Sequence, residues 1–306
     1  MQSMQRTLSG KCHFEGKGLH AGRFARMTVG PAPAGSGIRF LRSDLGPDAV
    51  IEARADFVSS TARSTSISDG EVTVMTIEHL MSALTGMGID NAFVELDNIE
   101  VPILDGSANP YVEAFLKTGI EEQEAPRNYL SLPHTVEVSD PETGAWIKAE
   151  PAESPSFDLT IDFNSTVIGV QTAHWDEGVD YVSEISPCRT FVFFHELEFL
   201  LSQNLIKGGD VDNALVVVEH PVTEEQVSRV ASVFNRPVMT VNPDGYLDNV
   251  KRHFPNECAR HKLLDLIGDL RLAGGFINAR VTGFKPGHTM NTRMAAALAE
   301  SIKEQA

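Results

Sequence analysis

Two short polar stretches, far apart in the sequence, have the residue types of one metal site. His261 and Asp265 are four residues apart in a segment with helical periodicity, so both side chains lie on the same face. This spacing is typical of two ligands of one divalent cation. With a third ligand from elsewhere in the chain, a four-coordinate site would keep one position open for water. His79 is a candidate third ligand, and Glu78 lies directly beside it. A hydrolytic centre needs such a pair, because the cation acidifies water and a nearby base takes the proton.

These segments also have simpler interpretations. The helix predicted at 257–272 could be a surface helix with a solvated polar stripe, which by itself is the commoner case. Glu78 could complement the dipole at a helix start, although it follows Thr76 by two residues and not by the three of a capping box. His288, before an alanine-rich helix, is either an incidental loop residue or a general acid that Asp269 holds protonated.

Composition narrows the class of protein. The chain has 306 residues with 42% hydrophobic and 22% charged residues, which is typical of a globular protein and long enough for two domains. A formal net charge of −17 argues against a general nucleic-acid role but leaves room for a small anionic ligand. Cys12, Cys188 and Cys258 have no CxxC spacing, so we expect buried free thiols.

Hydropathy gives an expectation of location. The apolar run at 214–218 is far too short to cross a bilayer. The first seven residues lack the apolar core of a secretory signal. We therefore expect a cytoplasmic protein without a transmembrane segment.

The spacing of apolar residues and turns predicts a mixture of strands and helices. Apolar stretches separated by Gly and Pro predict strands in 9–60, and Asp69-Gly70 predicts the turn of a β-hairpin over 65–74. The polar stretch 121–127 is the predicted linker between two domains. The other predicted elements are helices at 77–85, 109–119 and 257–272 and strands at 91–96, 136–138, 145–149, 157–163 and 276–281.

The two halves contain a weak internal duplication. Residues 88–92 align with 275–279, and the same spacing places Glu78 opposite Asp265. Each half then has a helix, a glycine and a strand, with reactive polar residues on the helix. A duplicated fold with one site between its copies would explain why the candidate ligands lie far apart in the sequence.

The order and spacing of these motifs resemble one family. The chain is similar to UDP-3-O-acyl-N-acetylglucosamine deacetylases, the zinc amidases of lipid A biosynthesis in Gram-negative bacteria. The likeness runs from near residue 9 to near residue 300, and the Arg-His-Lys-x-x-Asp-x-x-Gly-Asp run is its most specific motif. The matching stretches are 14–20, 76–80, 88–91, 102–107, 160–163, 189–191, 213–216, 260–269 and 287–288.

The resemblance implies an α+β fold. It consists of two similar domains, 1–123 and 128–306, each layering helices on small β-sheets with the active site between them. The hairpin at 65–75 matches the insert of the first domain. The insert of the second domain falls near 190–218 and forms a hydrophobic passage for a fatty acyl chain. The matching passage positions are Phe194, Leu197, Ile206, Val211, Ala214 and Val216.

The resemblance also implies a role for each site residue. His79, His261 and Asp265 hold Zn²⁺, or Fe²⁺ in the cell, with water at the fourth position. Glu78 is the general base, and His288, oriented by Asp269, protonates the leaving amine. Lys262 and Thr190 stabilise the oxyanion. The substrate contacts are Phe191 and Lys262 for the sugar nucleotide and Leu19 and His20 at the rim.

Other functions remain open at this point. The leading expectation is hydrolysis of the N-acetyl group of UDP-3-O-acyl-N-acetylglucosamine by a monomer. A metal amidase for a different acylated sugar is one alternative, and a non-catalytic binder of acylated nucleotide sugars is another. A dehydratase acting on acyl carrier protein accompanies this family in some bacteria, and we expect no such module in 306 residues.

Overall fold

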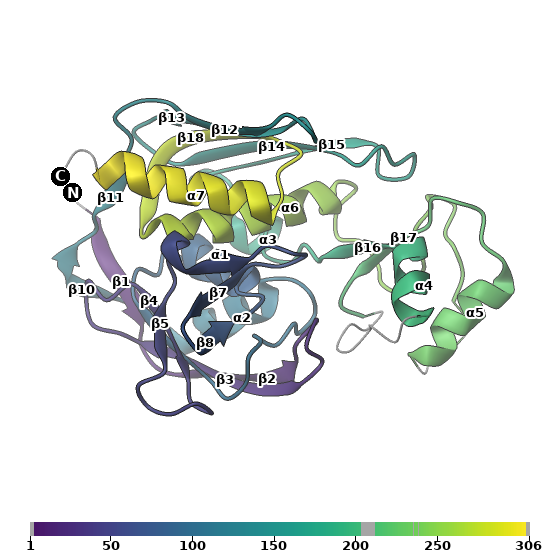
Figure 1. Cartoon of the computed structure of the whole chain (residues 1–306), viewed down its shortest axis with the longest axis horizontal. Coiled ribbons are helices and arrows are strands. Elements are labelled where there is room, and N and C mark those ends of the chain that lie inside the picture. The colour runs from purple at the N-terminus through teal and green to yellow at the C-terminus, as the bar shows by residue number, and fades with distance from the viewer. Residues whose placement is uncertain (1–2, 203–211, 235, 238, 304–306) are drawn as a thin grey trace.

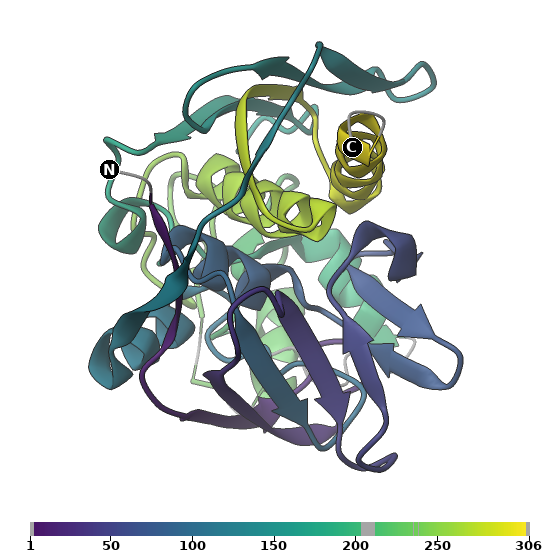
Figure 2. The same ribbon diagram turned by 90° about the vertical axis from the view of Figure 1, so that its left-hand side faces the viewer.

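The computed structural model describes residues 3–202, 212–234, 236–237 and 239–303. Two sheets form its outer layers, and helices lie between them (Figures 1 and 2). This arrangement confirms the α+β fold. In the described part of the chain, no helix is both long enough and apolar enough to cross a membrane.

The first sheet has five strands in the order β2-β3-β9-β4-β5. β4 and β9 run parallel, and the other neighbours run antiparallel. Alternate side chains of β4 are buried, as expected for a sheet with one face on the core. The strands are β2 (Cys12–Lys17), β3 (Phe24–Pro31), β4 (Ile38–Arg42), β5 (Val50–Glu52) and β9 (Ala92–Leu96).

The second sheet repeats this topology. Its main path is β12-β13-β18-β14-β15, again with one parallel pair, β14 and β18, while β11 adds to β18. The correspondence supports the duplication inferred from the sequence, although the predicted domain limits stay a prediction. The strands are β11 (Tyr129–Ser131), β12 (Val136–Asp140), β13 (Ala145–Pro151), β14 (Ser156–Asp162), β15 (Val170–Asp176) and β18 (Phe276–Phe284).

The helices pack between the sheets, with α1 against α6 at the centre and α7 beside α6 (Figure 1). The glycine stop after α2 is confirmed, since Gly119 has a φ of 93°, which favours glycine. The helices of this layer are α1 (Glu78–Gly86), α2 (Asn109–Thr118), α3 (Tyr181–Glu184), α6 (Glu257–Leu270) and α7 (His288–Lys303), with short 3₁₀ turns at Ala55–Phe57 and Arg271–Ala273.

Helix α6 is buried on nearly all sides, so the interpretation as a solvated surface helix is wrong. His261, Asp265 and Asp269 are each 1% exposed. A second helix can approach this polar face because residue 268 is glycine. A Cβ atom there would lie 2.1 Å from the Glu78 carbonyl oxygen, so only glycine allows the observed crossing of α1 and α6.

Two small inserts extend from the layers. The first is the sheet β6-β7-β8, which contains the predicted hairpin. Its turn lies one residue later than predicted, at Gly70 and Glu71, because Asp69 still pairs with Val72. Gly70 has a φ of 57°. The second has its own small core and projects to the right in Figure 1. That core reaches Leu247, well beyond the predicted limit of 218. The elements are β6 (Val58–Ser60), β7 (Ser66–Asp69), β8 (Val72–Val74), β16 (Phe191–Phe193), α4 (Phe194–Ser202), β17 (Leu215–Val217) and α5 (Glu224–Val233).

The predicted linker at 121–127 is wrong as a description of local structure. Most of it lies in strand β10 (Ile120–Pro126), which pairs antiparallel with β1 (Met4–Leu8). Pairing with a strand more than a hundred residues away satisfies the backbone, so a polar stretch forms a strand here. Arg127 then forms an ion pair with Asp90 at 2.7 Å.

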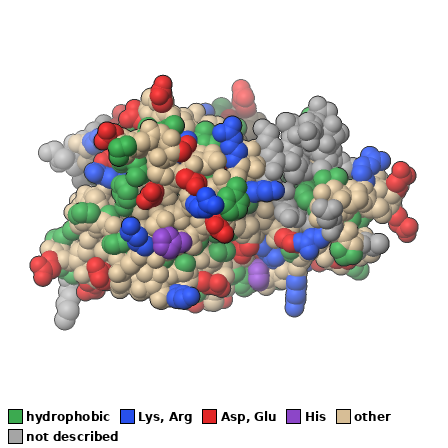
Figure 3. Space-filling model, turned by 90° about the horizontal axis from the view of Figure 1, so that it is seen from below, with side chains coloured by type: hydrophobic (Ala, Val, Ile, Leu, Met, Phe, Trp, Pro, Cys, Tyr) green, Lys and Arg blue, Asp and Glu red, His purple; other side chains and the backbone are tan. Residues whose placement is uncertain are grey.

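The distribution of charged side chains on the surface bears on nucleic-acid binding. On the face shown in Figure 3, basic and acidic side chains are scattered among one another, and the basic ones do not gather into a stripe. This face therefore lacks the electrostatic footprint of a nucleic-acid-binding surface.

Candidate metal centre and its cavity

Three buried side chains from two helices converge at the centre of the molecule. His79 lies on α1, and His261 and Asp265 lie on α6. One ligand atom from each residue lies within 4.8 Å of the others. Asp265 Oδ1 is 3.6 Å from His79 Nε2 and 3.5 Å from His261 Nε2. The structure therefore brings together all three predicted metal ligands.

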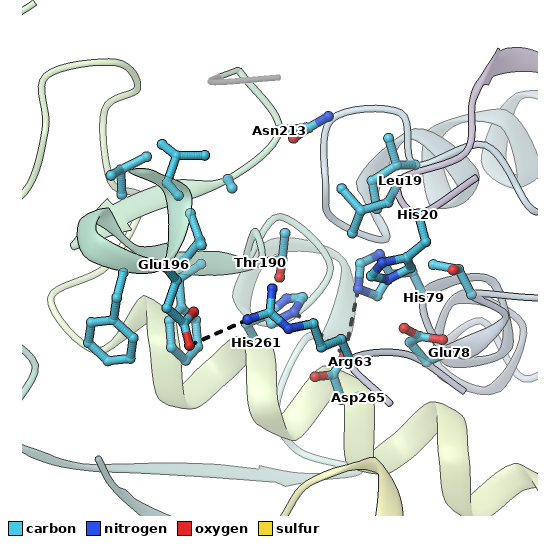
Figure 4. Close-up of a pocket in the computed structure, with 18 of the residues that line it drawn as sticks. Leu19, His20, Arg63, Glu78, His79, Thr190, Glu196, Asn213, His261 and Asp265 are labelled. Atoms are coloured by element: carbon cyan, nitrogen blue, oxygen red, sulfur yellow. Dashed lines mark ion pairs between the residues drawn. The ribbon is translucent and has the colours of Figure 1, made fainter. Parts of the chain in front are cut away.

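Hydrogen bonding orients His261 for coordination. Its Nδ1 is 3.1 Å from the Cys188 carbonyl oxygen, which can only accept, so Nδ1 carries the hydrogen. The lone pair is then on Nε2, which points toward Asp265 and His79 (Figure 4). Burial lowers the pKa of His261 to about 3, against the opposing effect of Asp265, and keeps the imidazole neutral. A neutral imidazole is the form that binds a cation.

Asp265 supplies the observation that best fits a missing cation. Its Oδ2 accepts a 2.7 Å hydrogen bond from Lys262 Nζ, whereas Oδ1 is buried without a hydrogen-bond partner among the described residues. Burial alone would raise the pKa of Asp265, but the positive charges of Lys262 and His288 hold it well below its usual range. A buried anionic oxygen facing two imidazole nitrogens is costly unless a cation pairs with it, so the residues present fit a divalent metal.

Glu78 lies beside the cluster at the first residue of α1 and is 3% exposed. Its Oε2 accepts a 3.0 Å hydrogen bond from the Thr65 N–H, and its Oε1 is 3.9 Å from His288 Nε2. Burial raises the pKa of Glu78, while His288 and His79 act in the opposite direction. A carboxylate with a raised pKa next to a metal cluster has the properties of a general base.

His288 and Asp269 form a second pair at the edge of the cluster. His288 is the first residue of α7 and not a loop residue, and its Nδ1 is 2.9 Å from Asp269 Oδ2. Burial lowers the pKa of His288, but Asp269 and Asp265 outweigh burial and raise it to about 9. Asn291 also donates to Asp269 Oδ2 at 2.9 Å, which fixes the carboxylate. The acids therefore favour the protonated form of His288, which the general-acid interpretation requires.

Lys262 and Thr190 face the same space from different elements. The Lys262 Nζ is 5.8 Å from the centre of the Phe191 ring. Burial would lower the pKa of Lys262, but Asp265 outweighs burial and raises it, so the ammonium stays charged. Thr190 is held in place by its N–H, which donates to the Gly106 carbonyl at 2.9 Å.

A cavity of about 580 Å³ opens over the cluster toward the second insert (Figure 4). All the predicted metal ligands line it, as do most of the predicted substrate contacts. The lining includes Leu19, His20, Glu78, His79, Thr190, Phe191, Leu197, Ala214, Val216, His261, Lys262, Asp265 and His288.

Among the described passage residues, Phe194 does not fit the prediction. Phe194 is 2% exposed, packs in the small core of the second insert and does not line the cavity. For this residue the simpler interpretation, ordinary core, matches the structure. Ile206 and Val211 lie outside the described residues.

Several residues at the site were not predicted. Thr65 donates to Asp269 Oδ1 at 2.6 Å and contacts His288 Nδ1 at 3.3 Å, so the first insert reaches the His288–Asp269 pair. Arg63 of that insert pairs with Glu196 of α4 at 3.5 Å across the cavity (Figure 4). Their sequence context is an ordinary hairpin and an ordinary helix, so no local signal distinguished them.

Fold and site together define a class of protein: an α+β protein with two sheets of like topology and a candidate metal centre on the helices between them. A family model described as UDP-3-O-acyl N-acetylglycosamine deacetylase matches residues 5–236 and 233–300. This chain belongs to that family.

Characterised relatives agree with the family match. The chain is 43% identical over 300 residues to the bifunctional enzyme LpxC/FabZ of Porphyromonas gingivalis, covering 98% of this chain and 65% of that protein. It is 39% identical over 299 residues to the UDP-3-O-acyl-N-acetylglucosamine deacetylase of Xanthomonas oryzae pv. oryzae, covering 97% of this chain and 90% of that protein. The deacetylase of Thioalkalivibrio sulfidiphilus is 38% identical over 297 residues, which cover 96% and 89% of the two chains. The chain thus spans less than two thirds of the length of the bifunctional relative.

Proposed function

We propose that this protein hydrolyses the N-acetyl group of UDP-3-O-acyl-N-acetylglucosamine to acetate and UDP-3-O-acyl-glucosamine, the committed step of lipid A biosynthesis. Family membership and the names of the relatives support this substrate. The single observation that carries the reaction type is the buried cluster of His79, His261 and Asp265 with Glu78 beside it. An amide is unreactive, and such a centre supplies both a nucleophile and stabilisation of negative charge.

His79, His261 and Asp265 would hold the metal, which we take to be Zn²⁺, with Fe²⁺ as the alternative in the cell. When bound, it would act as a Lewis acid that lowers the pKa of a water molecule to about 7. Two imidazoles and one carboxylate suit zinc because they leave one position open. The unpartnered Asp265 Oδ1 supports the fit of the cation to this site.

Proton transfer would be divided between two residues. Glu78 takes the proton of the attacking water. Burial raises the pKa of Glu78 toward neutral pH, which is where a general base works best. His288 donates a proton to the nitrogen of the amide as the C–N bond breaks, so the amine and not its anion leaves. Asp269 orients His288 through the 2.9 Å hydrogen bond to Nδ1. Water is consumed, and one acetate and one amine are formed.

The remaining residues would position the substrate. Lys262 and Thr190 donate to the oxygen that gains negative charge on attack. Phe191 and Lys262 contact the sugar nucleotide, and Leu19 and His20 form the rim. The apolar lining that Leu197, Ala214 and Val216 contribute suits a fatty acyl chain.

The direct test is acetate release from UDP-3-O-acyl-N-acetylglucosamine. We expect turnover by the metal-loaded protein, loss of turnover after chelation and recovery on adding Zn²⁺ back. The same assay with UDP-N-acetylglucosamine, which lacks the acyl chain, serves as the matched control and should give far slower release. Metal-loaded protein that binds the substrate but releases no acetate would instead indicate a binding protein. Equal rates on both substrates would indicate an amidase for a different acylated sugar.

Three further expectations stay predictions. These are the division into domains 1–123 and 128–306, a monomeric state and a cytoplasmic location. Size-exclusion chromatography with light scattering tests the monomer, and expression of each half alone tests the domain limits.

A further inference from the structure

A second buried carboxylate lies near the site but outside the metal cluster. Glu100 is 1% exposed, and its two oxygens accept hydrogen bonds from two separate segments of the chain. The N–H of His20 lies 2.9 Å from Oε1, and that of Ala21 lies 2.6 Å from Oε2. The hydroxyl of Thr76 donates to Oε1 at 2.8 Å. Glu100 does not line the cavity, so it acts only through these neighbours.

The first segment is the loop 18–21, whose residues Leu19 and His20 form one wall of the cavity (Figure 4). This loop approaches Glu100 closely, because a Cβ atom on Gly18 would lie 2.4 Å from Glu100 Oε2. Only glycine permits that contact. The Glu100 carboxylate thus sets the position of loop 18–21 at the cavity wall.

The second segment is the turn that leads into α1. Thr76 has a φ of 60°, which a β-branched residue adopts only when its surroundings enforce it. The hydroxyl bond to Glu100 holds the turn from one side. The Met75 N–H donates to the Ile99 carbonyl at 2.9 Å, and the Val101 N–H donates to the Met75 carbonyl at 3.1 Å. Two residues after Thr76 the chain presents Glu78, followed by His79.

We propose that Glu100 is a positioning residue that sets two walls of the site with one side chain. The two carboxylate oxygens accept the N–H groups of the substrate-facing loop 18–21 and hold it in place. The hydrogen bond from Thr76 fixes the start of α1, from which Glu78 and His79 project. The role rests on the function proposed above. Loss of the carboxylate should therefore affect substrate binding through the loop and turnover through the turn, although Glu100 touches neither substrate nor metal.

The test begins with Glu100→Gln, which keeps the shape but places an amide NH₂ where one oxygen accepted N–H donors. In hydrogen–deuterium exchange, we expect the amides of His20 and Ala21 to exchange at least tenfold faster than in the wild type. The matched control is Glu95→Gln on the exposed side of β9, which should leave both amides unchanged. In the deacetylation assay, Glu100→Gln should lose at least tenfold in kcat/KM, and Glu95→Gln should lose less than twofold.

Three more variants separate the effect on the loop from the effect on the turn, and they remain informative if Glu100→Gln does not fold. Gly18→Ala should mainly raise KM, because it displaces the loop. Thr76→Val should mainly lower kcat, because it frees the turn before Glu78, and Thr76→Ser should restore kcat by restoring the hydroxyl. A merely structural role would change stability without this division between KM and kcat.

The exchange measurement is independent of activity, so it separates the two proposals. Faster exchange at His20 and Ala21 in Glu100→Gln, together with an inactive wild type, would overturn the proposed reaction and leave the positioning of the loop intact. Unchanged exchange at both amides, or equal effects of Thr76→Val and Thr76→Ser on kcat, would overturn the role of Glu100.

Discussion

Replacement of Gly268 by alanine tests whether the site depends on the close approach of α1 and α6. The added Cβ would lie 2.1 Å from the Glu78 carbonyl oxygen and 2.9 Å from the Ser82 nitrogen. Real Cβ contacts essentially never fall below 3.0 Å, so the helices must separate by about 1 Å. No side-chain rotamer relieves the contact, since both partners are backbone atoms.

The magnitude follows from two opposing effects. Alanine favours a helix over glycine by about 1 kcal/mol, whereas overpacking costs about 1–3 kcal/mol and occasionally more. We expect the free energy of unfolding to fall by up to about 2 kcal/mol. The effect on activity should be larger, because α1 carries Glu78 and His79 and α6 carries the other two ligands. A displacement of about 1 Å in such a site lowers the rate about 100-fold.

The assay combines denaturant unfolding of the metal-free protein with acetate release by the metal-loaded protein. Gly283→Ala on β18 is the matched control, because its Cβ would meet no atom closer than 3.7 Å. That variant should keep wild-type activity. If Gly268→Ala shows wild-type stability and turnover, the crossing of α1 and α6 does not set the geometry of the site.

Three other predictions address single residues. Glu78→Gln should retain metal, as measured by elemental analysis, and lose about 10²–10⁴-fold in kcat, since it removes the base; wild-type turnover would contradict that role. Lys262→Met should raise the barrier for acetate release by about 3–4 kcal/mol, measured as kcat/KM, because it removes an oxyanion donor; a change confined to KM would instead indicate a binding role alone. His174, 46% exposed, lies between Asp158 and Asp176, and although burial lowers its pKa, the two acids raise it above 6.5. Its small contribution to stability is therefore fully present below the unfolded pKa of about 6.5 and is lost as pH rises through the folded pKa. NMR titration should show that pKa falling in Asp158→Asn, and an unchanged value would refute the pairing.

Local patterns in the sequence predicted many of the helices and strands and placed two candidate metal ligands on one helix face. The i, i+4 spacing of His261 and Asp265 placed both on one face of a helix, and the glycine stops gave helix ends to within a few residues. The β-hairpin was predictable because Gly70 occupies the left-handed region that such turns require, although the turn consists of Gly70 and Glu71 and not of Asp69 and Gly70.

Features that depend on contacts distant in sequence could not be predicted. The polar face of α6 reads as solvated, and it is buried only because α1 crosses at Gly268. The polar composition of 121–127 predicts a linker. In the structure most of this stretch forms a strand, because β1 lies beside it and supplies hydrogen-bond partners. Thr65 reads as a hairpin residue, and its hydrogen bonds to Glu78 and Asp269 exist only once the insert has folded over the helices.

The placement of the ligands on two helices has a consequence for folding. His79 comes from the first half of the sequence, and His261 and Asp265 come from the second. A cation that binds all three has little affinity for either half by itself, so its binding free energy adds to their association. Stability then rises with free cation concentration as RT ln(1 + [L]/Kd). If these three residues hold the cation, removing it with a chelator should lower the free energy of unfolding by weakening the association of the two halves.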